Sequence, residues 1–146
     1  MREIKFRAKV IATGPRQKFI LMNKPVKEGE WVYGEIHLKS STLPHIHVGT
    51  EYRYPIDVET VGQYTWFKDY YGKEIYEGDV IRSMVAGNNP VYHVIFWHPQ
   101  SASFRARLVK QGPPVDHCGI HMEWINKFHK EVIGNVYDNK EFLEEE

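Results

Sequence analysis

The segment from residue 4 to residue 10 constrains the fold more tightly than any other part of this sequence. Its side chains alternate strictly between apolar and basic: Ile4, Lys5, Phe6, Arg7, Ala8, Lys9 and Val10. Successive side chains of a β-strand point to opposite faces, whereas a helix repeats every 3.6 residues, so a period of two indicates a strand. The segment therefore predicts a strand with one buried face and one solvated, basic face.

The rest of the chain shows short runs of similar residues separated by turns. Val, Ile and Thr number 31 and the aromatic residues 20, whereas Ala and Leu together number only 10. β-Branched and aromatic side chains suit a pleated, half-buried surface, and Ala and Leu are the strongest apolar helix formers. The composition thus predicts an all-β fold. We expect further strands at 31–38, 45–48, 51–54, 61–67, 80–85, 91–97, 104–109 and 132–137.

Turn and helix signals complete this expectation. Gly72 supplies the positive φ that a hairpin loop requires, and Gly34 is a possible β-bulge. At 120–130 apolar residues recur at spacings of three and four, which predicts one short helix. A capped turn at 138–141 is the other place where a short helix fits, so we expect one or two at most. With no long linker and no low-complexity segment, we expect a single domain over residues 1–146.

Charge and cysteine content exclude several classes of protein. Lys plus Arg and Asp plus Glu number 19 each, so the formal net charge is zero, which excludes a nucleic-acid binder that is basic over its whole surface. Cys118 is the only cysteine, which excludes an internal disulfide framework and a four-cysteine zinc site. Gly-rich phosphate loops and the common hydrolase motifs are absent. No apolar run approaches the ~18 residues of a membrane span and no signal-peptide pattern opens the chain, so we expect a cytoplasmic protein with no membrane partner.

Charge is nevertheless concentrated at the two ends of the chain. Residues 1–30 hold eight Lys and Arg against three acids, and residues 131–146 hold one Lys against six acids. Two interpretations stay open: the two ends contact each other within or between subunits, or the basic end binds phosphate groups. The second interpretation predicts a nucleic-acid or partner face formed by Arg2, Lys5, Arg7, Lys9, Arg105 and Arg107.

One compact group of metal-ligating residues consists of His117, Cys118 and His121. A thiolate and two imidazoles are zinc ligands, but zinc needs a fourth ligand or a water, and the spacing matches no standard zinc pattern. The alternative is a polar loop with solvated histidines. Elsewhere, His45 and His47 share one face if their segment is extended. We therefore expect no cofactor, and we keep the group of three only as a set of metal candidates.

The middle third of the chain carries two further clusters. Its carboxylates fit either Mg²⁺ chemistry or ordinary turns and strand edges: Asp57, Glu59, Asp69, Glu74, Glu77 and Asp79. Its aromatic residues fit either base stacking beside Lys68 and Lys73 or core and subunit contacts: Tyr64, Trp66, Phe67, Tyr70, Tyr71 and Tyr76. We favour turns for the acids, and core or interface for the aromatic residues.

Several long motifs, in the same order along the chain, resemble the YopX family. The chain opens with Met-Arg-Glu-Ile-Lys-Phe-Arg-Ala, carries Glu-Gly-Glu-Trp-Val-Tyr-Gly at 28–34, and continues to Glu-Val-Ile-Gly-Asn-Val-Tyr-Asp-Asn at 131–139. The most specific block is 56–82, which includes Lys-Asp-Tyr-Tyr-Gly-Lys-Glu-Ile-Tyr-Glu-Gly-Asp-Val-Ile at 68–81. The resemblance covers nearly the whole chain.

The resemblance implies an SH3-type small β-barrel with additional N-terminal strands, in a protein carried by bacteriophages and prophages of Gram-positive bacteria. The biochemical function of that family is not established, so no catalytic residue is implied. Four motif glycines are backbone-geometry positions: Gly62, Gly72, Gly78 and Gly134. The chain departs from the family pattern after Ala8 and matches poorly at 39–54 and 98–122, where most of the histidines lie. A histidine site would therefore be particular to this protein.

We expect a phage-derived accessory protein that binds rather than catalyses, acting in the cytoplasm of the bacterial host. Its high aromatic content and open strand edges favour a self-assembling module, a homo-oligomer that contacts host or phage proteins. Two alternatives stay open. A nucleic-acid-binding β-barrel predicts one groove lined by the basic residues of the partner face, and a metal-dependent enzyme predicts zinc at His117, Cys118 and His121.

Overall fold

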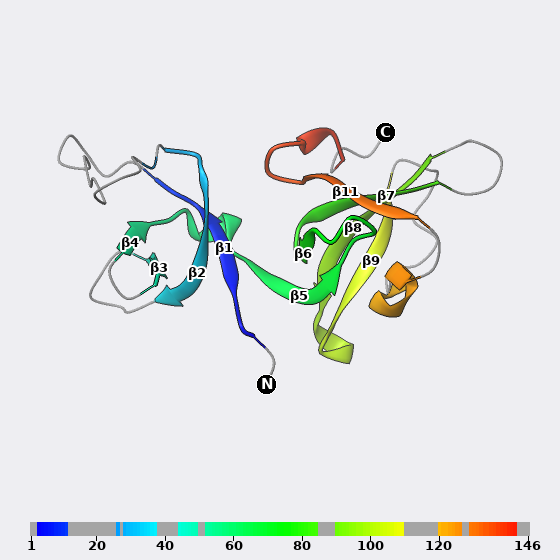
Figure 1. Ribbon diagram of the computed structural model, residues 1–146, viewed down its shortest axis with the longest axis horizontal. Helices are drawn as coiled ribbons and strands as arrows, with labels where there is room; N and C mark the ends of the chain where they lie inside the picture. Colours follow the sequence, from blue (N-terminus) through cyan, green and yellow to red (C-terminus); the bar gives the residue numbers. More distant parts are fainter. Residues whose placement is uncertain are drawn as a thin grey trace. The chain divides into compact units, whose positions relative to one another are not determined.

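The structure is a computed structural model that describes residues 3–11, 26, 28–37, 44–49, 52–84, 90–109, 120–126 and 129–142 (Figure 1). Its strands are β1 (Phe6–Lys9), β2 (Trp31–His37), β3 (His45–Val48), β4 (Tyr52–Pro55), β5 (Gly62–Lys68), β6 (Glu74–Tyr76), β7 (Asp79–Met84), β8 (Pro90–His98), β9 (Ser103–Val109), β10 (Ile120–His121) and β11 (Lys130–Asn135). Short 3₁₀ helices are η1 (Val58–Thr60), η2 (Pro99–Ser101), η3 (Met122–Asn126) and η4 (Lys140–Phe142). The strand-like runs of the sequence are thus strands.

Antiparallel pairing joins these strands into two sheets. One has the order β4-β3-β2-β1-β5-β6 and the other the order β10-β9-β8-β7-β11. The chain divides into two compact units, unit 1 at 1–63 and unit 2 at 64–146. The division falls within β5, whose Gln63 pairs with β1 and whose Tyr64 pairs with β6. The expectation of a single domain over the whole chain stays a prediction.

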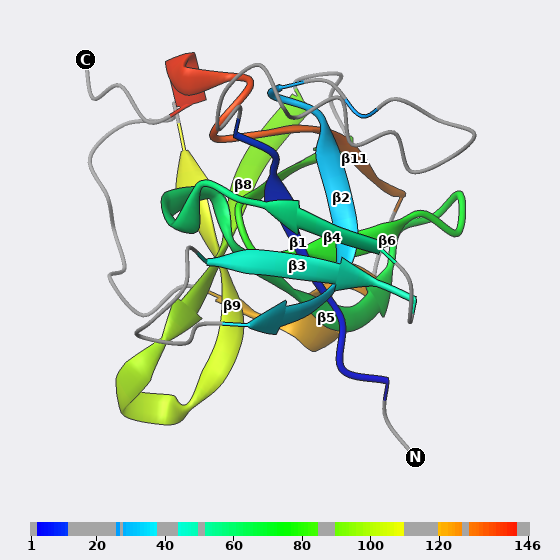
Figure 2. The same cartoon turned by 90° about the vertical axis from the view of Figure 1, so that its left-hand side faces the viewer.

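The apolar face of the sheet in unit 1 is buried, as its period of two predicts. Ala8 of β1 pairs with Val32 of β2, and Ile36 of β2 pairs with Ile46 of β3, so the even-numbered side chains of three strands share one face. Figure 2 shows these strands together. The buried cluster consists of Ala8, Val10, Val32, Ile46, Tyr54 and Ile56. Four of the six are β-branched, which agrees with the composition argument.

The opposite face of β1 corrects the expectation of a fully solvated basic face. Arg7 is only 5% exposed, and its guanidinium carbon lies 4.6 Å from the centroid of the Trp31 ring. The Lys9 ammonium lies 5.4 Å from the same ring. The alternation of β1 identifies the two faces correctly, but it cannot show which residue of the next strand lies against the basic side chains.

Gly34 in β2 marks a close approach between two strands. The pairing of β1 with β2 continues through Phe6 and Gly34 without a register shift, so the expected bulge is not present there. A Cβ atom added at Gly34 would lie 1.9 Å from the backbone oxygen of His47 in β3. Glycine fits because it has no side chain and lets the β3 backbone come this close.

Replacing Gly34 with alanine is expected to lower the free energy of unfolding by about 2 kcal/mol, because β3 must move to admit the methyl group. Chemical denaturation followed by circular dichroism measures the change. The matched control is Gly49→Ala, where an added Cβ meets nothing within 4 Å and only the φ of +65° opposes it. An equal or smaller loss for Gly34→Ala than for Gly49→Ala would contradict the close approach.

Unit 2 has apolar clusters on both faces of its five-stranded sheet. Neighbouring residues separate the faces: Ile81 and Ile95 belong to one cluster, whereas Val80 and Val94 belong to the other. The larger cluster consists of Ile75, Ile81, Ile95, Phe104, Ala106, Met122, Ile125 and Val132. The smaller cluster consists of Val80, Val94 and Val136, with Phe142 of η4 packed against it. A sheet with both faces packed explains the apolar runs in β7 and β8.

The prediction of a helix at 120–130 is wrong. The structure has the short strand β10, the five-residue η3 and, from Lys130, the strand β11. Met122 and Ile125 are buried three residues apart, a spacing that a 3₁₀ turn satisfies as well as an α-helix. Ile120 and His121 pair with β9, and Lys130 begins the pairing of β11 with β7, so both ends of the segment are strand.

The all-β fold class is confirmed. Helical segments among the described residues are limited to the four short 3₁₀ turns. Neither sheet closes into a barrel there, so the finer SH3-type assignment does not follow from the strand pairing. In the same part of the chain no helix is long and apolar enough to span a membrane.

Candidate binding surfaces

The basic residues of the predicted partner face are divided between the two units. Arg2 lies outside the described residues. Lys5 forms an ion pair with Glu3 at 3.5 Å, and Arg7 and Lys9 follow in β1 of unit 1. The other two, Arg105 and Arg107, lie in β9 of unit 2. The structure thus brings the basic residues together as two separate sets, each along one strand.

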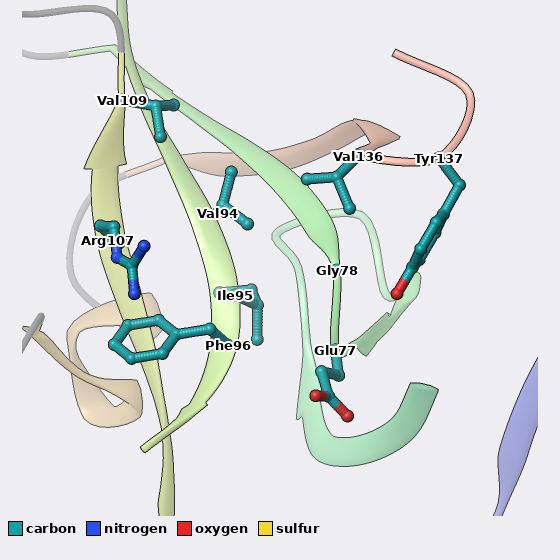
Figure 3. A pocket seen from close by; sticks show the side chains of 9 residues that line it. All are labelled: Glu77, Gly78, Val94, Ile95, Phe96, Arg107, Val109, Val136 and Tyr137. Carbon is teal, nitrogen blue, oxygen red and sulfur yellow. The ribbon is translucent and has the colours of Figure 1, made fainter. Parts of the chain in front are cut away.

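Arg107 borders an open pocket of about 230 Å³ in unit 2 (Figure 3). Its guanidinium carbon lies 4.5 Å from the centroid of the Phe96 ring. The lining residues are Glu77, Gly78, Val94, Ile95, Phe96, Arg107, Val109, Val136 and Tyr137. Pockets for small molecules usually measure about 300–1,000 Å³. This smaller, mainly apolar pocket suits a single side chain of a partner better than a cofactor.

The hairpin between β5 and β6 presents two aromatic side chains to solvent, here called the tyrosine tip. Tyr70 is 68% exposed and Tyr71 is 64% exposed. Their rings meet edge to face with 5.4 Å between centroids, and the His129 ring lies 4.0 Å from Tyr70 and 5.2 Å from Tyr71. Lys68 and Lys73 on either side of the tip are also exposed. Large aromatic side chains in contact with water are typical of binding surfaces.

Buried Asp69 holds this hairpin in one conformation. Its Oδ1 accepts hydrogen bonds from the backbone N–H groups of Tyr71 and Lys73, each at 2.9 Å. Its Oδ2 accepts one from the N–H of Val132 in β11 at 3.0 Å. The N–H of Tyr70 donates to the carbonyl of Lys130 at 2.9 Å. The tyrosine tip is therefore attached to the sheet of unit 2 by its backbone.

The other aromatic residues of the middle third belong to the interior, as favoured. Tyr64 and Tyr76 are buried and lie 5.5 Å apart, and Trp66 and Phe67 pack against the larger cluster of unit 2. Trp66 has a φ of 66° at a register shift in β5. Thr65 supports this bulge, because its hydroxyl donates to the Ile75 carbonyl at 2.8 Å and accepts from the Phe67 N–H at 3.3 Å. The cluster thus divides into core residues and the tyrosine tip.

Three histidines of unit 1 stack on adjacent strands. The ring centroids of His37 in β2 and His47 in β3 lie 3.6 Å apart, and those of His45 and His47 lie 5.0 Å apart, with the planes within 22° of parallel. Glu35 lies 3.8 Å from His37 Nε2. The sequence indicates only that His45 and His47 share a face, because the contribution of His37 depends on strand pairing.

The surroundings of the histidine stack disfavour protonation of His47. Burial lowers the pKa of His47, and the charges of His37, Arg53 and His45 lower it further, whereas Glu35 raises it. Nε2 of His47 is enclosed and has no hydrogen-bond partner. The stack therefore contains a ring that a nearby negative charge would help to protonate.

The predicted metal candidates receive no support from the structure. His117 and Cys118 lie outside the described residues, and His121 in β10 is exposed. Within the described ranges, no three or more His, Cys, Asp or Glu side chains form a group that could hold a metal ion. The histidine stack does not qualify because its rings lie face to face instead of directing their nitrogens to one point.

Three of the six acids of the middle third, the aspartates, bind backbone N–H groups at turns and strand ends, in agreement with the favoured interpretation for them. Asp57 caps η1 by accepting from the Glu59 N–H at 3.1 Å. Asp79 accepts from the Tyr76 N–H at 2.7 Å. Together with Asp69, these carboxylates bind backbone N–H groups, which is a structural use rather than metal ligation.

One histidine of unit 2, His93, is buried. The His93 ring is 4.5 Å from the Trp124 ring, and the Lys130 ammonium lies 4.5 Å from the same indole. Burial, followed by the positive charge of Lys130, lowers the pKa of His93 to about 4. Both His93 and Lys130 are enclosed, with 4% and 1% of their surface exposed. This group sits in the interior, so it bears on stability rather than on binding.

Comparison with known proteins confirms the resemblance seen in the sequence. A family model described as YopX protein matches residues 6–144, which is nearly the whole chain. No curated protein matches the chain.

Proposed function

Because this chain belongs to the YopX family, whose description states no activity, we propose that it is a non-catalytic binding module that assembles with further copies of itself and with host or phage proteins. The observation that carries this proposal is the tyrosine tip, where Tyr70 and Tyr71 are about two-thirds exposed on a hairpin whose backbone is held by Asp69. Tyrosine is enriched among residues that dominate binding energy at interfaces.

The rigid backbone of the hairpin supports binding through the tip. Ordering a flexible loop at an interface costs free energy, and a loop already fixed in its bound conformation avoids that cost. Three hydrogen bonds to one buried carboxylate fix this loop. The tip therefore offers a large aromatic contact area with little loss of conformational freedom.

Sedimentation velocity over a wide range of protein concentrations tests the proposal. We expect the protein to associate, and the double variant Tyr70→Ser, Tyr71→Ser to associate at least about tenfold more weakly, because tyrosine hot spots contribute about 2 kcal/mol or more. The matched control is Val58→Ser, which removes an exposed apolar side chain, 48% exposed, from unit 1. A protein that stays monomeric at every concentration, or a double variant that associates as tightly as the original, would overturn the proposal.

Nucleic-acid binding is the second candidate function. The basic residues predicted to bind nucleic acid give this function less support than the sequence suggests. Arg7 is buried, and Arg105 and Arg107 belong to unit 2 rather than unit 1. Lys68 and Lys73 beside the exposed tyrosines favour it, since bases stack on aromatic rings near cations. Loss of oligonucleotide binding, without loss of self-association, in Lys68→Gln, Lys73→Gln would favour this function over assembly through the tip.

We also propose the finer properties that the family resemblance implies. The protein is of phage or prophage origin and acts in the cytoplasm of the bacterial host. Its fold is related to the SH3-type small barrel, for which the antiparallel order β9-β8-β7 and the tight turn at Gly78, with a φ of +91°, give support. An experimental structure in which β11 and β10 do not approach closure would overturn the barrel relationship.

A further inference from the structure

We infer that the outer face of the sheet in unit 1 binds single-stranded nucleic acid, with bases stacked on Tyr33 and on the histidine stack and phosphates near Lys9 and Arg53. The apolar side chains of these strands point to the buried cluster, so the odd-numbered side chains share the opposite face. The inference concerns a surface separate in sequence from the tyrosine tip and does not depend on self-assembly.

Strand register places aromatic and basic side chains next to one another on this outer face. Lys9 pairs with Trp31, and Arg7 pairs with Tyr33. Further along, Glu35 pairs with His47, which in turn pairs with Arg53 of β4. The odd-numbered positions are Arg7, Lys9, Trp31, Tyr33, Glu35, His37, His45, His47, Arg53 and Pro55. Five of these ten side chains are aromatic rings, a composition suited to stacking bases.

The charge of the outer face favours a polyanion. Arg7, Lys9 and Arg53 are positive and Glu35 is the single carboxylate among the ten positions. Arg53 is exposed and Lys9 is half-buried, so both ammonium and guanidinium groups lie where a phosphate can approach. Arg7 is buried over the indole of Trp31, where its charge adds to the field without direct contact. A protein of zero net charge can bind nucleic acid through one such face even though its whole surface is not basic.

The rings of this face are placed for stacking. Tyr33 is 45% exposed. His37 stacks on His47 with its side chain one-third exposed, so it forms an open end of the histidine stack. Base stacking tolerates every sequence because every base has a π-face, and histidine and tyrosine are both used for it. The surface therefore fits a single strand, whose bases are unpaired, better than a duplex.

The histidine stack couples this binding to pH. The charged groups that act on His47 are His37 and Glu35 on β2, His45 on β3 and Arg53 on β4. Positive neighbours oppose protonation of His47 in the free protein. Phosphate groups on the outer face would offset that repulsion, so binding and proton uptake should favour each other by linkage.

Fluorescence anisotropy with a labelled oligothymidylate of about 15 nucleotides tests the inference. We expect binding that weakens about 5- to 10-fold between 50 and 200 mM salt, as two phosphate contacts predict for a single strand. At fixed salt, binding should tighten as the pH falls below about 6.5, because the pKa of His47 is lowered from the ordinary value of histidine. No binding at low salt and low pH would overturn the inference.

Variants assign the binding to this face. Arg53→Gln combined with Tyr33→Ser changes two exposed side chains and should weaken binding at least about tenfold. His47→Gln should reduce the pH dependence of binding, because it removes the ring whose protonation burial and the neighbouring positive charges oppose. The matched control is Lys140→Gln, which removes an exposed cation from unit 2. Should Tyr70→Ser, Tyr71→Ser abolish binding while Arg53→Gln, Tyr33→Ser does not, the nucleic acid binds at the tyrosine tip and the inference is wrong.

Discussion

Replacing Asp69 with alanine is expected to lower the free energy of unfolding by about 3–5 kcal/mol, because three hydrogen bonds to a carboxylate are lost at once. The N–H of Val132 is inside the sheet and would be left without an acceptor, whereas the N–H groups of Tyr71 and Lys73 are near solvent and can bind water. Most of the loss therefore comes from the bond to Val132, which joins residues 63 positions apart. Urea denaturation at neutral pH measures it.

The variant Asp69→Asn separates the loss of the hydrogen bond to Val132 from the loss of the two hydrogen bonds within the hairpin. Asp69→Asn keeps Oδ1, which can still accept from Tyr71 and Lys73, but its amide group replaces Oδ2 and meets the N–H of Val132 donor to donor. We expect a loss of about 2 kcal/mol for this variant. The matched control is Asp57→Ala, which removes one cap bond at an exposed turn and should cost about 1 kcal/mol or less.

The tyrosine tip links this stability prediction to function. If Asp69 fixes the hairpin, then Asp69→Ala should weaken self-association even though Tyr70 and Tyr71 are unchanged, because the loop must be ordered on binding. Hydrogen exchange of the hairpin amides checks whether the loop has loosened. An unfolding free energy within 1 kcal/mol of the original protein would show that water satisfies these N–H groups and that the carboxylate does not hold the tip.

Sequence patterns determine the local part of this fold, and strand pairing determines the rest. β2 and β3 lie where the alternation and the turn residues predict them, because both signals act within a few residues. The burial of Arg7 depends on Trp31, which lies 24 positions away along the chain on another strand. A local sequence pattern therefore cannot predict that Arg7 is buried. The failed helix at 120–130 has the same origin, since pairing with β9 and with β7 makes strands of the two ends of the segment.

The two candidate binding surfaces likewise combine features visible in the sequence with features that depend on strand pairing and packing. Tyr70 and Tyr71 stand out in the sequence because they directly precede a turn glycine, but only the structure shows that they are exposed whereas Tyr64 and Tyr76 are buried. The histidine stack combines a visible spacing, His45 and His47, with His37 from an adjacent strand. A register shifted by one residue would send these rings into the core, so the stack depends on the pairing of β2 with β3.

Acidification is expected to destabilise unit 2 through His93. The pKa of this buried histidine is lowered to about 4, from an ordinary value near 6.5, by burial and by the charge of Lys130. The unfolded chain therefore takes up the proton first as the pH falls. The contribution of His93 to the free energy of unfolding is fully present above about pH 6.5 and declines as the pH falls toward about 4. The total decrease in the free energy of unfolding reaches up to about 3 kcal/mol.

Comparison of pH profiles isolates the contribution of His93 from that of the carboxylates. His93→Phe keeps a ring against Trp124 and removes both titration and the enclosed Nδ1, which has no hydrogen-bond partner. Its unfolding free energy should change less than that of the original protein between about pH 6.5 and about pH 4. If phenylalanine does not fit, His93→Gln serves as the second non-titrating variant, and His121→Gln is the exposed control.

The fluorescence of Trp124 should report the protonation of His93 in the folded protein. A protonated His93 would lie 4.5 Å from the indole, so its charge should alter the emission of that tryptophan with a midpoint near pH 4 in the folded protein. The midpoint should disappear in His93→Phe and persist in His121→Gln. Parallel stability profiles for the original protein and His93→Phe would mean that His93 has the same pKa in the folded and unfolded states, which the burial of the ring and the adjacent Lys130 both oppose.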